Sequence, residues 1–150
     1  MQRSSKSSVV REFGPLAVYL DSNVLFSASY IASSRFLNFW RLTGVVPVTS
    51  PYAVTEVRRH IKQSAQTVRF DKLIAATKMV SDADSDFVPE SIELVEKDRP
   101  ILAAAIAASV DYLITGDKSH FALLYGIQVS GVYVIGPAEF LSLFEGRLIV

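Results

Sequence analysis

The stretch YLITGDKSHF, residues 112–121, places an abrupt polar end on an apolar run. Its first four residues are typical of a buried strand, which stops at Gly116-Asp117. An aspartate at this place either holds the turn that follows the strand or contributes to chemistry at the edge of a sheet. The other segments of the chain help to decide between these two interpretations.

Further apolar runs alternate with segments of helical spacing. Strands are expected at 16–20, 45–49, 112–115 and 132–135, with a minor one at 87–88. Helices are expected at 22–42 (one or two), 50–61, 65–79, 98–110 and 137–144, with a short one at 89–95. The alternation predicts an α/β fold of three layers, in which a central, mostly parallel sheet is covered by helices on both faces.

The composition limits the domain count and the setting. The chain has 150 residues, which is the size of one domain, and residues 15–150 are expected to form it. The serine-rich and basic residues 1–14 are expected to be a flexible tail without the apolar run of a signal peptide. The absence of cysteine excludes disulfides and thiolate metal sites. No run approaches about 18 apolar residues, so we expect a cytoplasmic protein without a membrane span.

Charge is unevenly distributed, although the formal net charge is zero. Residues 57–78 contain six lysines and arginines against one acid, and residues 81–98 contain seven acids against one lysine. The basic segment is either a surface that follows a phosphate backbone or a solvated helix face. The candidates for contact with phosphate are Arg58, Arg59 and Lys62.

Four acids fall where a parallel sheet gathers its functional groups. Asp21 and Asp117 follow strands, whereas Glu56 and Asp98 lie at the starts of helices. Each has a structural alternative: Asp21 and Asp117 as turn residues, Glu56 as an exposed helix residue and Asp98 as an N-cap. Taken together, their common position at one edge of the sheet favours a shared site.

Such convergence has a chemical consequence. Two carboxylates about 5 Å apart repel each other by about 3 kcal/mol at an effective dielectric constant near 20. Four of them therefore require protons or a hard cation, and oxygen ligands suit Mg²⁺ or Mn²⁺. An ion of this kind activates water and stabilises a phosphodiester under attack, so the pattern favours metal-assisted phosphodiester hydrolysis.

Four segments, in order along the chain, resemble the motifs of the PIN-domain family. They are LDSN (20–23), SPYAVTE (50–56), KDRPILAAAIAA (97–108) and DYLITGDKSHF (111–121). The resemblance implies an α/β/α nuclease fold with an acidic pocket for Mg²⁺ or Mn²⁺. Many such proteins are the endoribonuclease toxins of toxin–antitoxin pairs, the VapC-type proteins, so the resemblance implies an RNA substrate.

The resemblance also implies roles for individual residues. Asp21 and Asp98 would bind the metal directly, and Asp117 would bind it directly or through water. Glu56 would orient the nucleophilic water or complete the surroundings of the ion. Asn23 and Thr115 match polar positions that hold the site together.

The segment after Asp117 departs from the family pattern. Many members have a further aspartate at the place of Ser119, which supports the site here without a charge. His120 is expected to pack against or cap a following helix. The departure leaves an alternative function open: a catalytically weak or inactive PIN-fold module that binds RNA or docks a protein.

Partners are also implied by the resemblance. Toxins of this type commonly form homodimers and are inhibited by an antitoxin that inserts a segment near the acidic pocket. The region after the first strand contains more large apolar side chains than one helix face easily buries: Phe26, Tyr30, Phe36, Phe39 and Trp40. This surplus either forms a groove for the partner or packs in the core.

Overall fold

The computed structural model describes residues 15–147, in which six strands form one sheet of order β3-β2-β1-β4-β6-β5. Neighbouring strands are parallel except for β5, which is antiparallel to β6. The strands are β1 (Leu16–Leu20), β2 (Val45–Thr49), β3 (Lys78–Met79), β4 (Tyr112–Ile114), β5 (Gln128–Val129) and β6 (Val132–Ile135). The expected tail, residues 1–14, lies outside the described residues.

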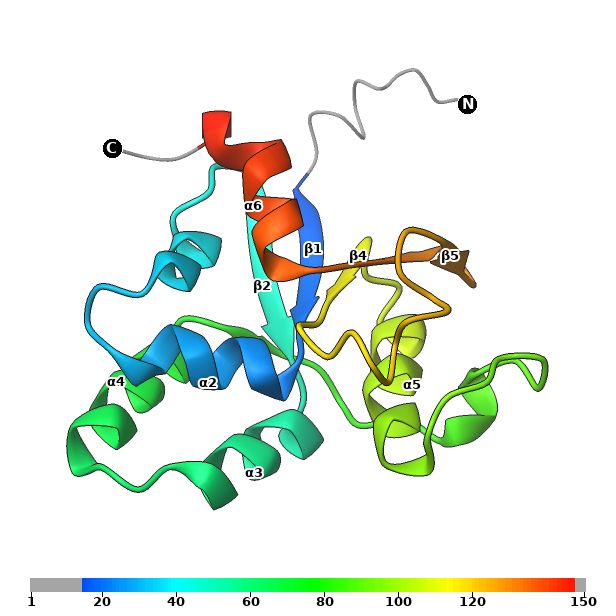
Figure 1. Ribbon diagram of the computed structural model, residues 1–150, viewed down its shortest axis with the longest axis horizontal. Coiled ribbons are helices and arrows are strands. Elements are labelled where there is room, and N and C mark those ends of the chain that lie inside the picture. The colour runs from blue at the N-terminus through cyan, green and yellow to red at the C-terminus, as the bar shows by residue number, and fades with distance from the viewer. Residues whose placement is uncertain (1–14, 148–150) are drawn as a thin grey trace.

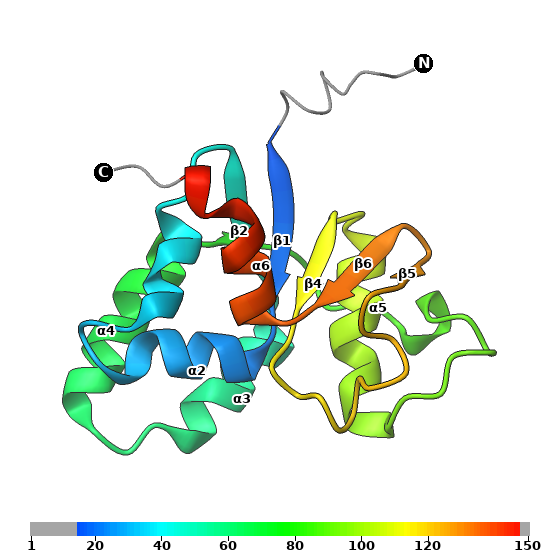
Figure 2. The same ribbon diagram turned by 45° about the horizontal axis from the view of Figure 1, so that its top comes forward.

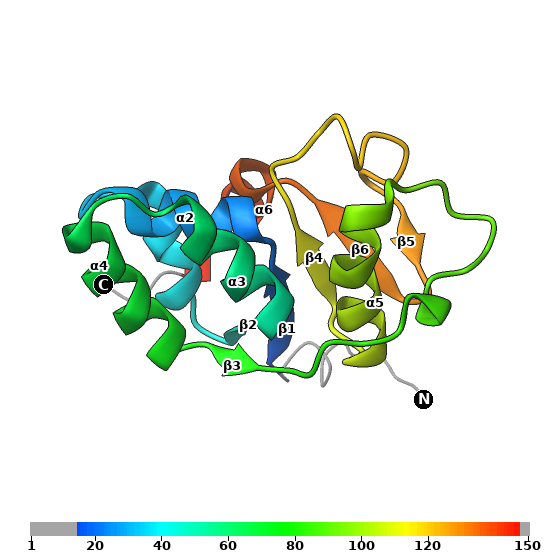
Figure 3. The ribbon, with the colours of Figure 1, turned by 90° about the horizontal axis from the view of Figure 1, so that it is seen from below.

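Helices cover both faces of the sheet, as predicted for a three-layer α/β fold. Figures 1 and 2 show α6 on one face and α5 on the opposite one, and Figure 3 shows the molecule from below, with α3 and α5 in front of the strands. The α-helices are α2 (Ser22–Tyr30), α3 (Pro51–His60), α4 (Ser64–Ala75), α5 (Arg99–Ala107) and α6 (Pro137–Phe144). The 3₁₀ helices are η1 (Arg35–Trp40), η2 (Ser85–Phe87), η3 (Glu96–Asp98) and η4 (Glu145–Arg147). No helix in residues 15–147 is long and apolar enough to span a membrane.

The two faces of β4 show how the layers are held together. The ring of Tyr112 packs edge-on against Phe140 and Phe144 of α6, with centroid distances of 5.1 and 6.0 Å. The next residue, Leu113, is fully buried and points to the other face, since side chains alternate along a strand. There α5 presents the buried alanines 103–105, whose small side chains allow the helix to lie close to the sheet.

Four details differ from the sequence predictions. The expected helix 65–79 ends at Ala75, because residues 78–79 pair with β2 as β3. Residues 85–87 form η2, where the Asp84 carboxylate accepts a hydrogen bond from the Asp86 amide, so there is no strand at 87–88. Residues 89–95 have turns and irregular backbone in place of a short helix. The strand β5 was not predicted.

Replacement of Leu113 by alanine should lower the free energy of unfolding by about 2–5 kcal/mol, because it leaves a cavity between the sheet and α5. Chemical denaturation monitored by circular dichroism measures this loss. The matched control is Leu123→Ala, whose side chain is 73 % exposed and which should change stability by about 0.5 kcal/mol or less. Equal losses for the two variants would contradict this packing arrangement.

Candidate active site

The polar residues of the site meet where the strand order reverses. From β1 the chain moves outward to β2 and β3, then returns to the other side of β1 as β4. The carboxyl ends of β1 and β4 are joined there by a hydrogen bond of 3.0 Å from the Asp21 amide to the Ile114 carbonyl. A crevice at such a reversal is the usual binding place in open parallel sheets.

Asp21 lies at this reversal and is almost completely buried. Its Oδ1 accepts a hydrogen bond of 2.6 Å from the Ser22 amide, so the residue caps the first turn of α2. Its Oδ2 accepts from the Thr115 hydroxyl at 2.9 Å and from the Asn23 amide group at 3.4 Å. The two oxygens are thus held by donors from both sides of the strand reversal, which stabilises a buried carboxylate.

Thr115 and Asn23 also fix the chain that follows β4. The Thr115 hydroxyl accepts from the Asp117 amide at 3.1 Å, and Asn23 Oδ1 accepts from the Gly116 amide at 2.8 Å. A side chain at Gly116 would approach Asn23 Oδ1 to 3.3 Å, so glycine permits this close contact. Asn23 and Thr115 thus connect α2 and the end of β1 to the loop after β4.

Asp98 and Asp117 meet around an imidazole. His120 Nδ1 lies 2.6 Å from Asp98 Oδ2 and 2.9 Å from Asp117 Oδ2. The three residues offer ligand atoms that all lie within 4.8 Å of one another. Asp98 starts α5 but makes no side-chain capping bond, so its N-cap alternative does not explain it. Asp117 does hold a turn, since its Oδ1 accepts from the Ser119 hydroxyl at 3.0 Å and from the His120 amide at 3.1 Å.

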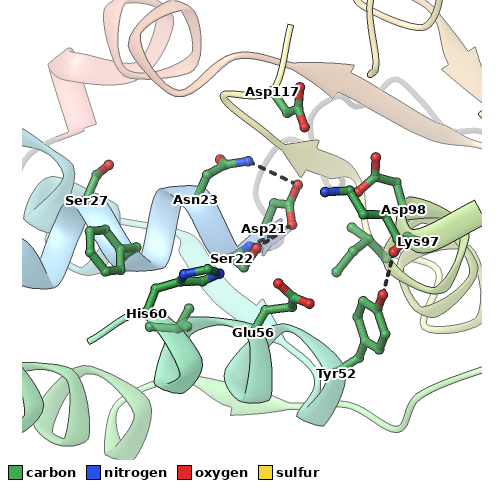
Figure 4. Close-up of a pocket in the computed structure, with 13 residues that line it drawn as sticks. Asp21, Ser22, Asn23, Ser27, Tyr52, Glu56, His60, Lys97, Asp98 and Asp117 are labelled. Atoms are coloured by element: carbon green, nitrogen blue, oxygen red, sulfur yellow. Dashed lines mark hydrogen bonds between the residues drawn. The ribbon is translucent and has the colours of Figure 1, made fainter. Parts of the chain in front are cut away.

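All four predicted acids line one pocket of about 480 Å³ (Figure 4). They come from four separate elements: Asp21 from the end of β1, Glu56 from α3, Asp98 from η3 and Asp117 from the loop after β4. Glu56 differs from the other three acids, because its carboxylate forms an ion pair of 2.9 Å with Arg59 on the same helix.

Burial and mutual repulsion raise the pKa values of two of these acids. Burial raises the pKa of Asp21 from 3.8 to about 6, and the charges of Asp98 and Asp117 add to the effect against the lowering by hydrogen bonds from Thr115 and Ser22. Burial also raises the pKa of Asp98, although its contact with His120 acts in the opposite direction. A site that resists negative charge in this way fits a divalent cation, which would relieve the repulsion among oxygen ligands.

Several residues in or beside the pocket were not among the predicted site residues. Tyr52 and Lys97 line it, and the Tyr52 hydroxyl donates a hydrogen bond of 2.6 Å to the Lys97 carbonyl. This bond ties the start of α3 to the segment that presents Asp98. His120 was expected to pack against or cap a helix, but residues 118–127 form turns and bends, and its ring reaches the acids. Its position three residues after Asp117 is the sequence signal for this contact.

The three basic residues that were predicted to contact phosphate have different surroundings in the structure. Arg58 pairs with Asp71 at 2.9 Å, and its guanidinium lies 4.9 Å from the ring centre of Phe70. Arg59 pairs with Glu56, while Lys62 is exposed. Two of the three basic side chains are therefore engaged in ion pairs within the molecule. His60, at the end of α3, lines the pocket itself.

A comparison with protein-family models decides the classification. The model described as PIN domain matches residues 17–119, which include all four acids. The chain belongs to the PIN-domain family. The resemblance seen in the four sequence motifs is thus confirmed, and the pocket lies within the matched part of the PIN domain.

Solved structures agree on the fold. A chain in the crystal structure of VapBC2 from Rickettsia felis bound to a DNA fragment from their promoter superposes with a TM-score of 0.59. The sequences are 14 % identical, and the match covers 81 % of this chain and 98 % of that one. At this identity the likeness concerns the fold of the PIN domain alone. No curated protein sequence matches the chain significantly.

The raised pKa of Asp21 predicts a pH-dependent stability in metal-free protein. The folded state holds this proton more tightly than the unfolded chain, so the stability from protonation is fully present below about pH 3.8 and lost as the pH rises through about 6. The side-chain amide of the Asp21→Asn variant cannot ionise. The free energy of unfolding of the wild type, minus that of Asp21→Asn, should therefore fall by about 2–3 kcal/mol between pH 4 and pH 7.

Urea denaturation of both proteins in the presence of a chelator gives this difference at each pH. Carboxylates elsewhere titrate in both proteins and cancel. A difference that does not change with pH would show that Asp21 ionises as readily in the folded state as in the unfolded one.

Proposed function

We propose that the chain is a metal-dependent endoribonuclease that acts in the cytoplasm and uses Mg²⁺ or Mn²⁺ to hydrolyse RNA phosphodiester bonds. The observation that carries the proposal is the gathering of four carboxylates from four elements around one pocket of a PIN domain. Buried acids with raised pKa values are expected where a cation and a substrate phosphate are to be bound.

Asp21, Asp98 and Asp117 would hold the metal ion, Asp117 directly or through water. A divalent ion at this place supplies activation of a water molecule and stabilisation of charge on the phosphodiester. Glu56, on the α3 side of the pocket, would orient the attacking water. Thr115 and Asn23 keep the Asp21 carboxylate at a fixed position, and Ser119 does the same for Asp117.

The pocket also offers groups suited to RNA. Lys97 and His60 lie on its wall as partners for phosphate, and the rings of Tyr52 and Phe26 offer surfaces on which bases can stack. Arg58, Arg59 and Lys62 extend this side of the molecule along α3. Their contribution would require exchange of the ion pairs of Arg58 and Arg59 for pairs with phosphate.

We further propose that the enzyme is the VapC-type toxin of a toxin–antitoxin pair, a homodimer inhibited by a small antitoxin. Beside the pocket, Phe26, Tyr30, Ile31 and Phe36 line an apolar groove of about 450 Å³. Tyr30 and Ile31 are more than half exposed, although Phe39 is fully buried in the core. An amphipathic segment of an antitoxin suits such a groove, and copurification with the product of a small neighbouring gene tests this partner.

Replacement of either Asp21 or Asp98 by asparagine should abolish RNA cleavage. With single-stranded and structured RNA in millimolar Mg²⁺ or Mn²⁺, we expect Asp21→Asn and Asp98→Asn each to lower the rate about 100-fold or more, because an ion held by these oxygens contributes several kcal/mol to the transition state. A chelator should stop cleavage by the wild type. Gel analysis of labelled RNA measures the rates.

The matched control is Glu90→Gln, which removes an exposed carboxylate that does not line the pocket and should cleave at the rate of the wild type. Circular dichroism checks that the variants remain folded. Undiminished cleavage by Asp21→Asn would refute the assignment of the site. Wild-type protein that binds RNA without cleaving it at millimolar Mg²⁺ or Mn²⁺ would instead be an RNA-binding module, the alternative that the missing charge at Ser119 leaves open.

A further inference from the structure

His120 completes a mixed donor set with two of the acids. Its Nδ1 is 2.6 Å from Asp98 Oδ2 and 2.9 Å from Asp117 Oδ2, and the ligand atoms of all three residues lie within 4.8 Å of one another. Around an octahedral ion with bonds of about 2.1 Å, neighbouring ligand atoms lie about 3 Å apart. The distances from the imidazole nitrogen to the two carboxylate oxygens are therefore close to the distance between neighbouring ligand atoms of one ion.

The loop that presents His120 is well anchored. The Phe121 amide donates to the Asp117 carbonyl at 3.1 Å, and the side chain of Phe121, the residue after His120, is fully buried. The Tyr125 hydroxyl donates to the Thr115 carbonyl, which returns the loop to the end of β4. His120 itself is only 29 % exposed. The ring is thus partly buried and in contact with both acids, and it does not extend freely into solvent.

Ser119 and His120 together change the chemistry of the site. The serine hydroxyl is bound to Asp117 Oδ1, so Asp117 Oδ2 is the oxygen that faces the imidazole. We propose that His120 is a nitrogen ligand of the metal ion, beside Asp98 and Asp117, so that the site prefers Mn²⁺ and related first-row transition ions to Mg²⁺. The proposal rests on the metal site of the proposed function and names one of its ligands.

The chemistry of the two ions gives the reason for this preference. Imidazole is a good ligand for first-row transition ions, whereas Mg²⁺ is bound mainly by carboxylate, phosphate and water oxygens. Ligation through Nδ1 uses the tautomer with its proton on Nε2, and no net loss of a proton from a neutral ring is needed. A carboxylate at residue 119 would add charge without selecting between the ions.

Pulsed electron paramagnetic resonance of the Mn²⁺ complex tests the ligation directly, because a bound imidazole nitrogen couples to the electron spin. The protein should carry no histidine tag and should be prepared with ¹⁵N-labelled histidine, so that any coupling is assigned to a histidine ring. The chain contains two histidines, and both contact the pocket region. His60→Ala should keep the nitrogen coupling and His120→Ala should lose it.

Calorimetric titration gives a second readout. We expect His120→Ala to weaken Mn²⁺ binding about tenfold or more, at least the loss caused by removal of an outer partner of a metal ligand. Mg²⁺ binding should weaken less. The Glu90→Gln control, at an exposed residue that does not line the pocket, should bind both ions as the wild type does, and circular dichroism confirms that each variant is folded.

The outcomes separate this proposal from the metal site on which it rests. Mn²⁺ binding that persists in Asp21→Asn and Asp98→Asn would refute the metal site itself. Binding that needs these acids but shows no ring-nitrogen coupling would refute only the role of His120. Tighter Mn²⁺ binding by His120→Ala would also overturn it, because the imidazole would then compete with the ion for the two carboxylates.

Discussion

The hydrogen bond from the Thr115 hydroxyl to Asp21 Oδ2 is the contact on which the site depends. A carboxylate at the centre of a sheet, without water, is tolerated only if donors compensate its charge. The donors here come from both chain segments that meet at the strand reversal, so the same contacts that hold β1 and β4 in register also orient the acid. Loss of register between these strands would remove both the fold of this edge and the geometry of the pocket.

Two of the pocket acids also hold the local backbone. Asp21 caps α2 and also borders the pocket, and Asp117 holds a turn while it faces His120. The sequence alternatives of a turn residue or a functional residue are therefore not exclusive at these two positions. At Asp117, Oδ1 accepts the bonds of the turn while Oδ2 faces His120, whereas at Asp21 both oxygens accept hydrogen bonds and still have lone pairs to spare. Asp98 differs, because its side chain makes no capping bond.

The positions of the acids could be predicted because they follow from local patterns. Apolar runs that end at Asp21 and shortly before Asp117, together with the rule for parallel sheets, predict both residues at one edge of the sheet. The contacts of side chains across the fold could not be predicted in this way. The reach of His120 to Asp98 depends on a loop of turns, and β3 depends on pairing with β2, which overrides a helical pattern in residues 76–79. The ion pair of Glu56 with Arg59, in contrast, joins residues three apart on α3, a spacing at which opposite charges on a helix are neighbours.

The two edges of the sheet restrict how the molecule can associate. The edge strand β3 has two residues, Lys78 and Met79, and β5 at the other edge also has two. Such short edges offer few unpaired backbone groups to an additional strand, and a lysine on an edge further discourages pairing. Growth of the sheet by another chain is thereby disfavoured, and association with other chains is left to side-chain surfaces on the helices. The site at the centre of the sheet can then be approached by a partner without any change in strand pairing.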